Sequence, residues 1–94
     1  MVAQDLAQLH LIVTGRVQGV FFRRATADQA RVLGLKGFAR NCPDGSVEIV
    51  AEGKRQSLEM LLKWAGHGPP HARVDKVQPV WADFSDEFAE FSVR

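Results

Sequence analysis

Residues 15–24 read GRVQGVFFRR and lie between a strand pattern and a helix pattern. Before them, residues 9–14 (LHLIVT) alternate in the manner of a strand that buries one face. After them, residues with small or apolar side chains recur at helical spacing from Phe22 to Leu33. A glycine-containing loop that leaves a strand and opens a helix offers backbone N–H groups beside the positive end of the helix dipole. The stretch therefore predicts a strand-loop-helix unit with an anion site in its loop.

The basic residues of this stretch strengthen the prediction of an anion site. Arg16, Arg23 and Arg24 lie in the loop or directly after it. Cations at the start of a helix oppose its dipole, so helix stability does not explain them. An anion held between the arginines and the loop backbone does explain them, and phosphate is the ligand we expect.

The rest of the chain predicts one α+β domain. The expected elements are a strand at 9–14, a helix at 22–33, strands at 36–41 and 46–52, a helix at 55–66, a strand at 73–82 and a short strand at 88–94. The turn Pro43-Asp44-Gly45 joins the two middle strands as a hairpin, and Pro79 favours an edge position for the strand that contains it. The order is the ferredoxin-like βαββαβ pattern, in which an antiparallel sheet carries two helices on one face. The short C-terminal strand is an addition to that pattern.

Composition limits the possible functions. The 94 residues carry a net charge of +1, which gives no reason to expect general binding to nucleic acid or to a membrane. Cys42 is the single cysteine, so a disulfide within the chain and a cysteine-based zinc cluster are excluded. We expect one domain over residues 1–94 with a loose lead-in at 1–8, a monomer, and a cytoplasmic location, since no signal-peptide or membrane-spanning pattern is present.

Several familiar motifs do not fit. The loop lacks the Lys-Ser/Thr of a P-loop and the spacing of a dinucleotide-binding loop. Residues 36–39 (KGFA) imitate the start of an RNA-recognition signature, but the second aromatic residue is missing. His10, His67 and His71 do not have the spacing of metal ligands, so no metal site is expected.

Residues 15–23 (GRVQGVFFR) closely resemble the signature of the acylphosphatase family, G-x-V-Q-G-V-x-F-R. The likeness continues through GFARN at 37–41, DGSVE at 44–48, GPP at 68–70 and FSVR at 91–94. The resemblance implies a βαββαβ domain that hydrolyses acyl phosphates to a carboxylate and inorganic phosphate without a metal or other cofactor. It implies an acyl phosphate as the small-molecule substrate, and phosphate as product and inhibitor.

The resemblance also implies which residues act. Arg23 and Asn41 match the catalytic arginine and asparagine, and the phosphate-binding backbone matches Gln18, Gly19, Val20 and Phe21. A planar guanidinium is able to hold two phosphate oxygens, and an amide carries both an acceptor and a donor for a water molecule. Asn41 therefore suits in-line positioning of the attacking water, although it cannot act as a base.

Two alternatives stay open at this stage. Asn41 also suits a structural role as a cap of the turn before Pro43. The same loop also suits a non-catalytic module that binds phosphate or a phosphorylated ligand. Arg16 and Arg24 lie outside the matched catalytic positions and are expected to supply supporting charge or to be solvated.

Overall fold

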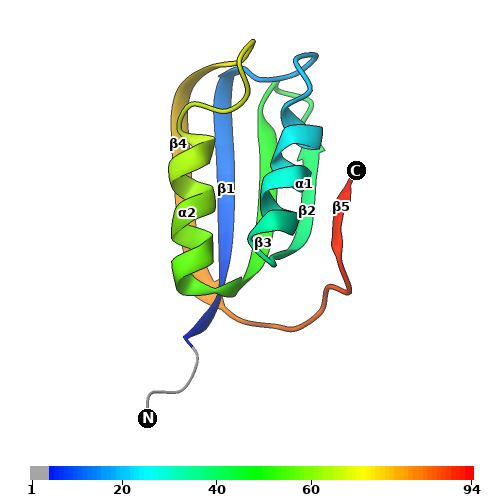
Figure 1. Cartoon of the computed structure of the whole chain (residues 1–94). Coiled ribbons are helices and arrows are strands. Elements are labelled where there is room, and N and C mark those ends of the chain that lie inside the picture. Colours follow the sequence, from blue (N-terminus) through cyan, green and yellow to red (C-terminus); the bar gives the residue numbers. More distant parts are fainter. Residues whose placement is uncertain (1–4) are drawn as a thin grey trace.

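The computed structural model describes residues 5–94, in which two helices cover one face of a five-stranded sheet (Figure 1). The elements in chain order are β1 (Leu6–Arg16), α1 (Phe22–Val32), β2 (Lys36–Asn41), β3 (Val47–Lys54), α2 (Arg55–Ala65), β4 (Arg73–Asp83) and β5 (Phe91–Val93). The predicted ferredoxin-like α+β fold is confirmed. In the described part of the chain, neither helix is long and apolar enough to cross a membrane.

The strands are arranged in the order β4-β1-β3-β2-β5. β1 pairs antiparallel with both β3 and β4, and β2 pairs antiparallel with β3. β4 therefore forms one edge, which agrees with the position predicted from Pro79. The short strand β5 pairs parallel with β2, so the sheet is mixed at that edge. Residues 84–90 run beneath the lower end of the sheet, from β4 to the far side of β2 (Figure 1).

Alternation along the strands places the core between the sheet and the helices. Leu9, Leu11 and Val13 of β1 are fully buried, as their spacing predicts. Each such side chain contributes roughly 1.5–3 kcal/mol when it is fully buried. The other core residues with no measurable exposure are Ala27, Ala30, Ala39, Val47, Ile49, Ala51, Leu58, Leu61 and Ala65. One continuous core thus fixes both ends of the loop between β1 and α1.

β1 and β3 extend well beyond the ends that the sequence predicts, and β4 is longer by one residue, Asp83. Residues 6–8, assigned to a loose lead-in, belong to β1, because they pair with residues 52–54 of β3. For the same reason β3 continues through Gly53 to Lys54, whereas the sequence suggests an end at Glu52. The part of the predicted lead-in at residues 1–4 lies outside the described residues.

Glu52 is the principal departure from the alternation pattern, which places it on the solvent side of β3. Its side chain is buried, with a residue exposure of 2%. The carboxylate accepts hydrogen bonds from Gln8 Nε2 (2.9 Å), Ser85 N (2.7 Å), Ser85 Oγ (2.6 Å) and Asp86 N (3.0 Å). Burial alone would raise the pKa of Glu52, but the hydrogen bonds from Ser85, Gln8 and Asp86 outweigh it and lower the pKa. Glu52 therefore fastens the connection between β4 and β5 to the sheet.

Candidate active site

The loop between β1 and α1 is held at its start by a close approach of two strands. The pairing of β1 with β4 is irregular between Thr14 and Gly15. Gly15 has φ +128°, and a Cβ atom placed there would lie 2.1 Å from the carbonyl oxygen of Arg73. Only glycine fits such a position without moving the backbone. Val17 and Val20 then insert into the core, with exposures of 1% and 9%, so the loop is anchored on both sides of Gln18 and Gly19.

The loop leaves a row of backbone donors without acceptors. Among residues 5–94, the N–H groups of Gln18, Gly19, Val20 and Phe21 donate no hydrogen bond. They immediately precede α1, whose own first N–H groups add to the positive end of the helix dipole. Gly19 has φ +73° and no atom within 4 Å of a hypothetical Cβ, so the requirement for glycine there is conformational and the space beside it is open. The loop has the donors and the room that an anion needs.

Gln18 has a second role that the sequence does not reveal. Its side-chain Nε2 donates to the carbonyl oxygens of Cys42 (2.8 Å) and Ser46 (2.9 Å). These carbonyls belong to the turn that joins β2 to β3, so the side chain ties the loop to the residues directly after Asn41. Only the backbone of Gln18 follows from the family resemblance, because contacts between segments that are distant in sequence leave no local pattern.

Arg23 lies in the first turn of α1 and contacts Arg94, the residue that follows β5. Its Nη1 donates to the carbonyl oxygen of Arg94 at 2.5 Å, and the backbone N–H of Arg94 donates to the carbonyl oxygen of Ala39 at 2.8 Å. Arg94 thus links Arg23 to β2, two residues before Asn41. Arg24 is exposed, and no ion pair involves it within the described part of the chain.

Asn41 carries a buried acceptor without a partner. It is the last residue of β2 and pairs with Val47 across the hairpin. Its Oδ1 is buried and receives no hydrogen bond from any of residues 5–94. A buried unsatisfied acceptor costs about 1–3 kcal/mol, so a ligand or water that donates to it is favoured.

The turn after Asn41 is stabilised by other groups. The Asp44 carboxylate accepts from Ser46 N (3.0 Å) and Ser46 Oγ (2.6 Å), and these bonds lower the pKa of Asp44. Cys42 N also donates to the Ser46 carbonyl oxygen at 2.8 Å. The Asn41 side-chain oxygen takes no part in this turn, which argues against the alternative reading of Asn41 as its cap.

A cavity of about 240 Å³ adjoins the loop and is lined by Gly19, Phe21, Phe22, Arg23, Arg24 and Val93. It brings the loop, the start of α1 and β5 together around Arg23. Asn41 does not line it, and within residues 5–94 no hydrogen bond joins Arg23 to Asn41. Arg23 is connected to β2, the strand that ends at Asn41, through Arg94 and Ala39.

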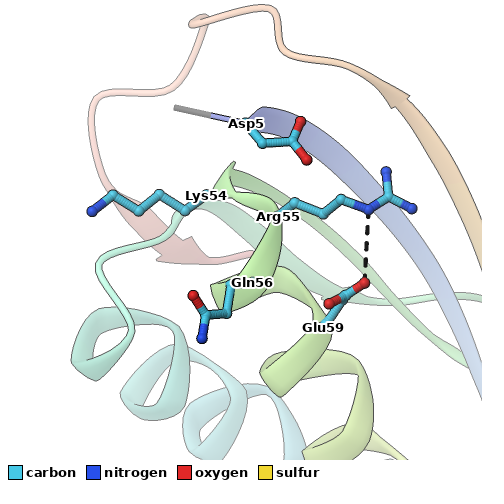
Figure 2. Close-up of a pocket in the computed structure, with 5 residues that line it drawn as sticks. All are labelled: Asp5, Lys54, Arg55, Gln56 and Glu59. Atoms are coloured by element: carbon cyan, nitrogen blue, oxygen red, sulfur yellow. Dashed lines mark ion pairs between the residues drawn. The ribbon is translucent and has the colours of Figure 1, made fainter. Parts of the chain in front are cut away.

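A larger cavity, of about 360 Å³, lies at the opposite end of β1 and is lined by Asp5, Lys54, Arg55, Gln56 and Glu59 (Figure 2). It is not a second anion site of the same kind. The N–H of Arg55 already donates to the Asp5 carbonyl oxygen at 2.8 Å, and the Arg55 side chain pairs with Glu59 at 3.7 Å (Figure 2). Residues 5–94 also contain no cluster of His, Cys, Asp and Glu suited to hold a metal ion.

The acylphosphatase family model matches residues 9–93. The chain belongs to the acylphosphatase family. An acylphosphatase of Anaeromyxobacter sp. (strain Fw109-5) is 50% identical over 90 residues, which cover 96% of this chain and 97% of that protein. An acylphosphatase of Pelotomaculum thermopropionicum is 48% identical over 87 residues, which cover 93% and 95% of the two chains. The resemblance found in the loop sequence is therefore confirmed along nearly the whole chain.

The family also accounts for the fold. The structure of an acylphosphatase from Coxiella burnetii superposes with a TM-score of 0.91 at 38% identity, and all of both chains is covered. The crystal structure of the acylphosphatase from Bacillus subtilis gives a TM-score of 0.90 at 33% identity and covers 94% of this chain and 98% of that one.

Proposed function

We propose that this member of the acylphosphatase family hydrolyses acyl phosphates to a carboxylate and inorganic phosphate. The observation that carries the proposal is the row of four loop N–H groups, from Gln18 to Phe21, without acceptors in the described structure and next to Arg23. Preorganised donors of this kind stabilise the charge of a phosphoryl group without having to reorganise during the reaction.

In the proposed complex, Arg23 holds the phosphate opposite the loop. A guanidinium has five N–H donors, and one Nη1 donor of Arg23 is engaged by the Arg94 carbonyl oxygen. The remaining edge of the guanidinium is available for two phosphate oxygens in the bidentate geometry that arginine favours. The bond to Arg94 fixes the side chain, so less conformational entropy is lost when phosphate binds.

Asn41 positions the attacking water in this mechanism. Its buried Oδ1 has no hydrogen-bond donor among residues 5–94, and in the mechanism it accepts a hydrogen bond from the attacking water. The water oxygen forms a bond to phosphorus while the bond between phosphorus and the acyl oxygen breaks. The leaving group is a carboxylate, which needs no general acid, and the proton of the water passes to a phosphate oxygen. The loop N–H groups and Arg23 stabilise the negative charge of the phosphoryl group during the reaction. The proposed mechanism uses no metal ion.

The test is hydrolysis of acetyl phosphate by wild type and by the Arg23→Gln variant, with and without a chelator. We expect chelator-insensitive turnover and competitive inhibition by inorganic phosphate in wild type, and we expect Arg23→Gln to lose both turnover and the binding of inorganic phosphate. Loss of one preorganised charge contact lowers kcat by roughly 10²–10³-fold or more. Lys63→Gln is a matched control, because Lys63 is an exposed cation on α2 that forms no ion pair with any of residues 5–94.

Near-normal hydrolysis by Arg23→Gln would refute the role of Arg23. If the wild-type protein binds inorganic phosphate but does not cleave acetyl phosphate, the result would support the alternative of a non-catalytic module that binds phosphate through the same loop. We further propose that the monomer is the working unit, since the loop, Arg23 and Asn41 all come from one chain.

A further inference from the structure

Phe21 is an exposed aromatic residue that lines the cavity of about 240 Å³. Its exposure is 77%, whereas its neighbour Phe22 is buried at 1% and packs against Trp64 with ring centroids 5.6 Å apart. The two phenylalanines thus have different roles. Phe22 stabilises the core, but the ring of Phe21 gains little from burial in the folded protein.

The backbone at Phe21 is also unfavourable for an aromatic residue. It has φ 62° and ψ 25°, which is the left-handed region. Bulky side chains are rare there, while asparagine and glycine are tolerated. Phe21 is also the N-cap of α1, and its side chain makes no capping hydrogen bond. Considered for stability alone, position 21 favours asparagine over phenylalanine.

A second exposed apolar side chain lines the same cavity. Val93 of β5 is 45% exposed and lines the same 240 Å³ space as Phe21 and Arg23. The volume is below the roughly 300–1,000 Å³ of cavities that take drug-sized ligands. The cavity therefore combines a phosphate-binding arginine with two apolar contacts and suits a small acyl group.

We propose that Phe21 and Val93 form the subsite for the acyl half of the substrate and select apolar acyl groups, above all aromatic ones. The inference rests on the proposed function, because a phosphate held by the loop and Arg23 places the attached acyl group in this cavity. An aromatic acyl group gains ring contact with Phe21 and burial of apolar surface against Val93. Neither residue takes part in bond breaking, so their effect is on selection among acyl phosphates.

Arg24 provides the main alternative for the same cavity. It is exposed, lines the cavity, and has no ion pair within the described residues. It would therefore suit an acyl group that bears a carboxylate. We favour the apolar acyl group, because an ion pair with a solvated surface arginine contributes little. The exposed ring of Phe21 is not explained by stability, and Val93 offers a second apolar contact in the same cavity.

The test compares benzoyl phosphate with acetyl phosphate in the Phe21→Asn variant. Asparagine keeps the backbone N–H and tolerates the left-handed backbone better than phenylalanine does. We expect the ratio of kcat/KM for benzoyl phosphate to that for acetyl phosphate to fall about tenfold, which corresponds to ~1.4 kcal/mol. The fall should come mainly from KM for the aromatic substrate. The melting temperature of Phe21→Asn should rise. If the ring of Phe21 had a structural role, the melting temperature should fall instead.

Val93→Asn should lower the same ratio, and Val32→Asn should leave it unchanged. Val32 is a suitable control because it is 84% exposed at the other end of α1. An unchanged ratio in Phe21→Asn would overturn the inference. The inference would also be overturned if wild type preferred succinyl phosphate to benzoyl phosphate and Arg24→Gln removed that preference. If wild type cleaves neither benzoyl nor acetyl phosphate, the proposed function itself fails; if it cleaves both and the ratio does not respond, only the acyl subsite fails.

Discussion

Replacement of Glu52 by glutamine should destabilise the protein by loosening the connection from β4 to β5. Oε2 accepts from Gln8 Nε2, Ser85 N and Ser85 Oγ, and Oε1 accepts from Asp86 N. In Glu52→Gln, the best placement puts the new NH₂ group at the Oε1 position, where it faces the Asp86 N–H and leaves that donor unpaired. The other three bonds change from a charged to a neutral acceptor.

The magnitude follows from these four bonds. Hydrogen bonds to charged groups contribute about 1.5–3 kcal/mol and neutral ones about 0.5–1.5 kcal/mol, so each of the three retained bonds loses roughly 1 kcal/mol. An unpaired donor adds about 1 kcal/mol more, and water that reaches the partly exposed connection recovers some of the total. We expect the free energy of unfolding to fall by about 3 kcal/mol, which lowers the melting temperature by roughly 12–24 °C in a domain of this size.

The loss of unfolding free energy in Glu52→Gln should become smaller as the pH falls. The pKa of Glu52 in the folded protein is below its usual value of 4.5. Its contribution to stability is therefore fully present above that value and is lost as the pH falls through the folded-state pKa. The Glu52→Gln variant lacks this term, so the difference in unfolding free energy between the two proteins should shrink as the pH falls below 4.5. Glu48, whose pKa is also lowered, is present in both proteins, so its contribution to the pH dependence cancels in the difference.

Urea unfolding between about pH 7 and about pH 3.5 measures this difference directly. Glu59→Gln is the control, because the Glu59 side chain is 58% exposed and its ion pair with Arg55 is long at 3.7 Å. A difference below about 0.5 kcal/mol for Glu52→Gln, the range of an ordinary surface substitution, or one that does not change with pH, would refute the reasoning.

Two further substitutions test the loop and the attacking water. Asn41→Ala should lower kcat for acetyl phosphate by roughly 10²-fold, the scale of one preorganised contact, while inhibition by inorganic phosphate is retained; an equal loss of phosphate inhibition would make Asn41 a phosphate-binding residue. Gly15→Ala should lower the free energy of unfolding by about 3 kcal/mol, because its Cβ would meet the Arg73 carbonyl oxygen at 2.1 Å on a backbone with φ +128°. Gly45→Ala shares a positive φ, +94°, but has open space around the Cβ, so chemical denaturation should show a loss of only about 1 kcal/mol; equal losses in the two variants would contradict the steric argument.

Local patterns in the sequence predicted the parts of the fold that depend on local spacing. The strand at residues 36–41 coincides with β2, and the apolar set of β1 is buried as its alternation requires. Phe22 heads the buried side of α1, as its helical spacing indicates. Pro79 lies on an edge strand because its missing N–H is tolerated only there.

The features that the sequence did not predict depend on contacts between distant segments. Alternation places Glu52 toward solvent, and it is buried because Ser85, 33 residues further along, covers it. The side chain of Gln18 reaches two carbonyls that are 24 and 28 residues away. The parallel pairing of β5 depends on the route of residues 84–90, which no local period encodes. For the site, the family resemblance implies roles for Arg23, Asn41 and the loop backbone, and these roles stay predictions. Helical spacing assigned Phe22 to the core, but no pattern in the sequence indicated that the ring of Phe21 is exposed.

The hydrogen bond between Arg23 and Arg94 has a consequence for the order in which the protein assembles. The two residues are 71 positions apart, whereas the contacts that tie Gln18 to the hairpin turn span 24 and 28 positions. Contacts that close longer loops cost more chain entropy and form later on average. During refolding, the phosphate loop should therefore pack against the hairpin before Arg23 bonds to Arg94, the residue after β5. Recovery of hydrolysis then reports the docking of the last strand, and it lags behind the formation of the loop that binds phosphate.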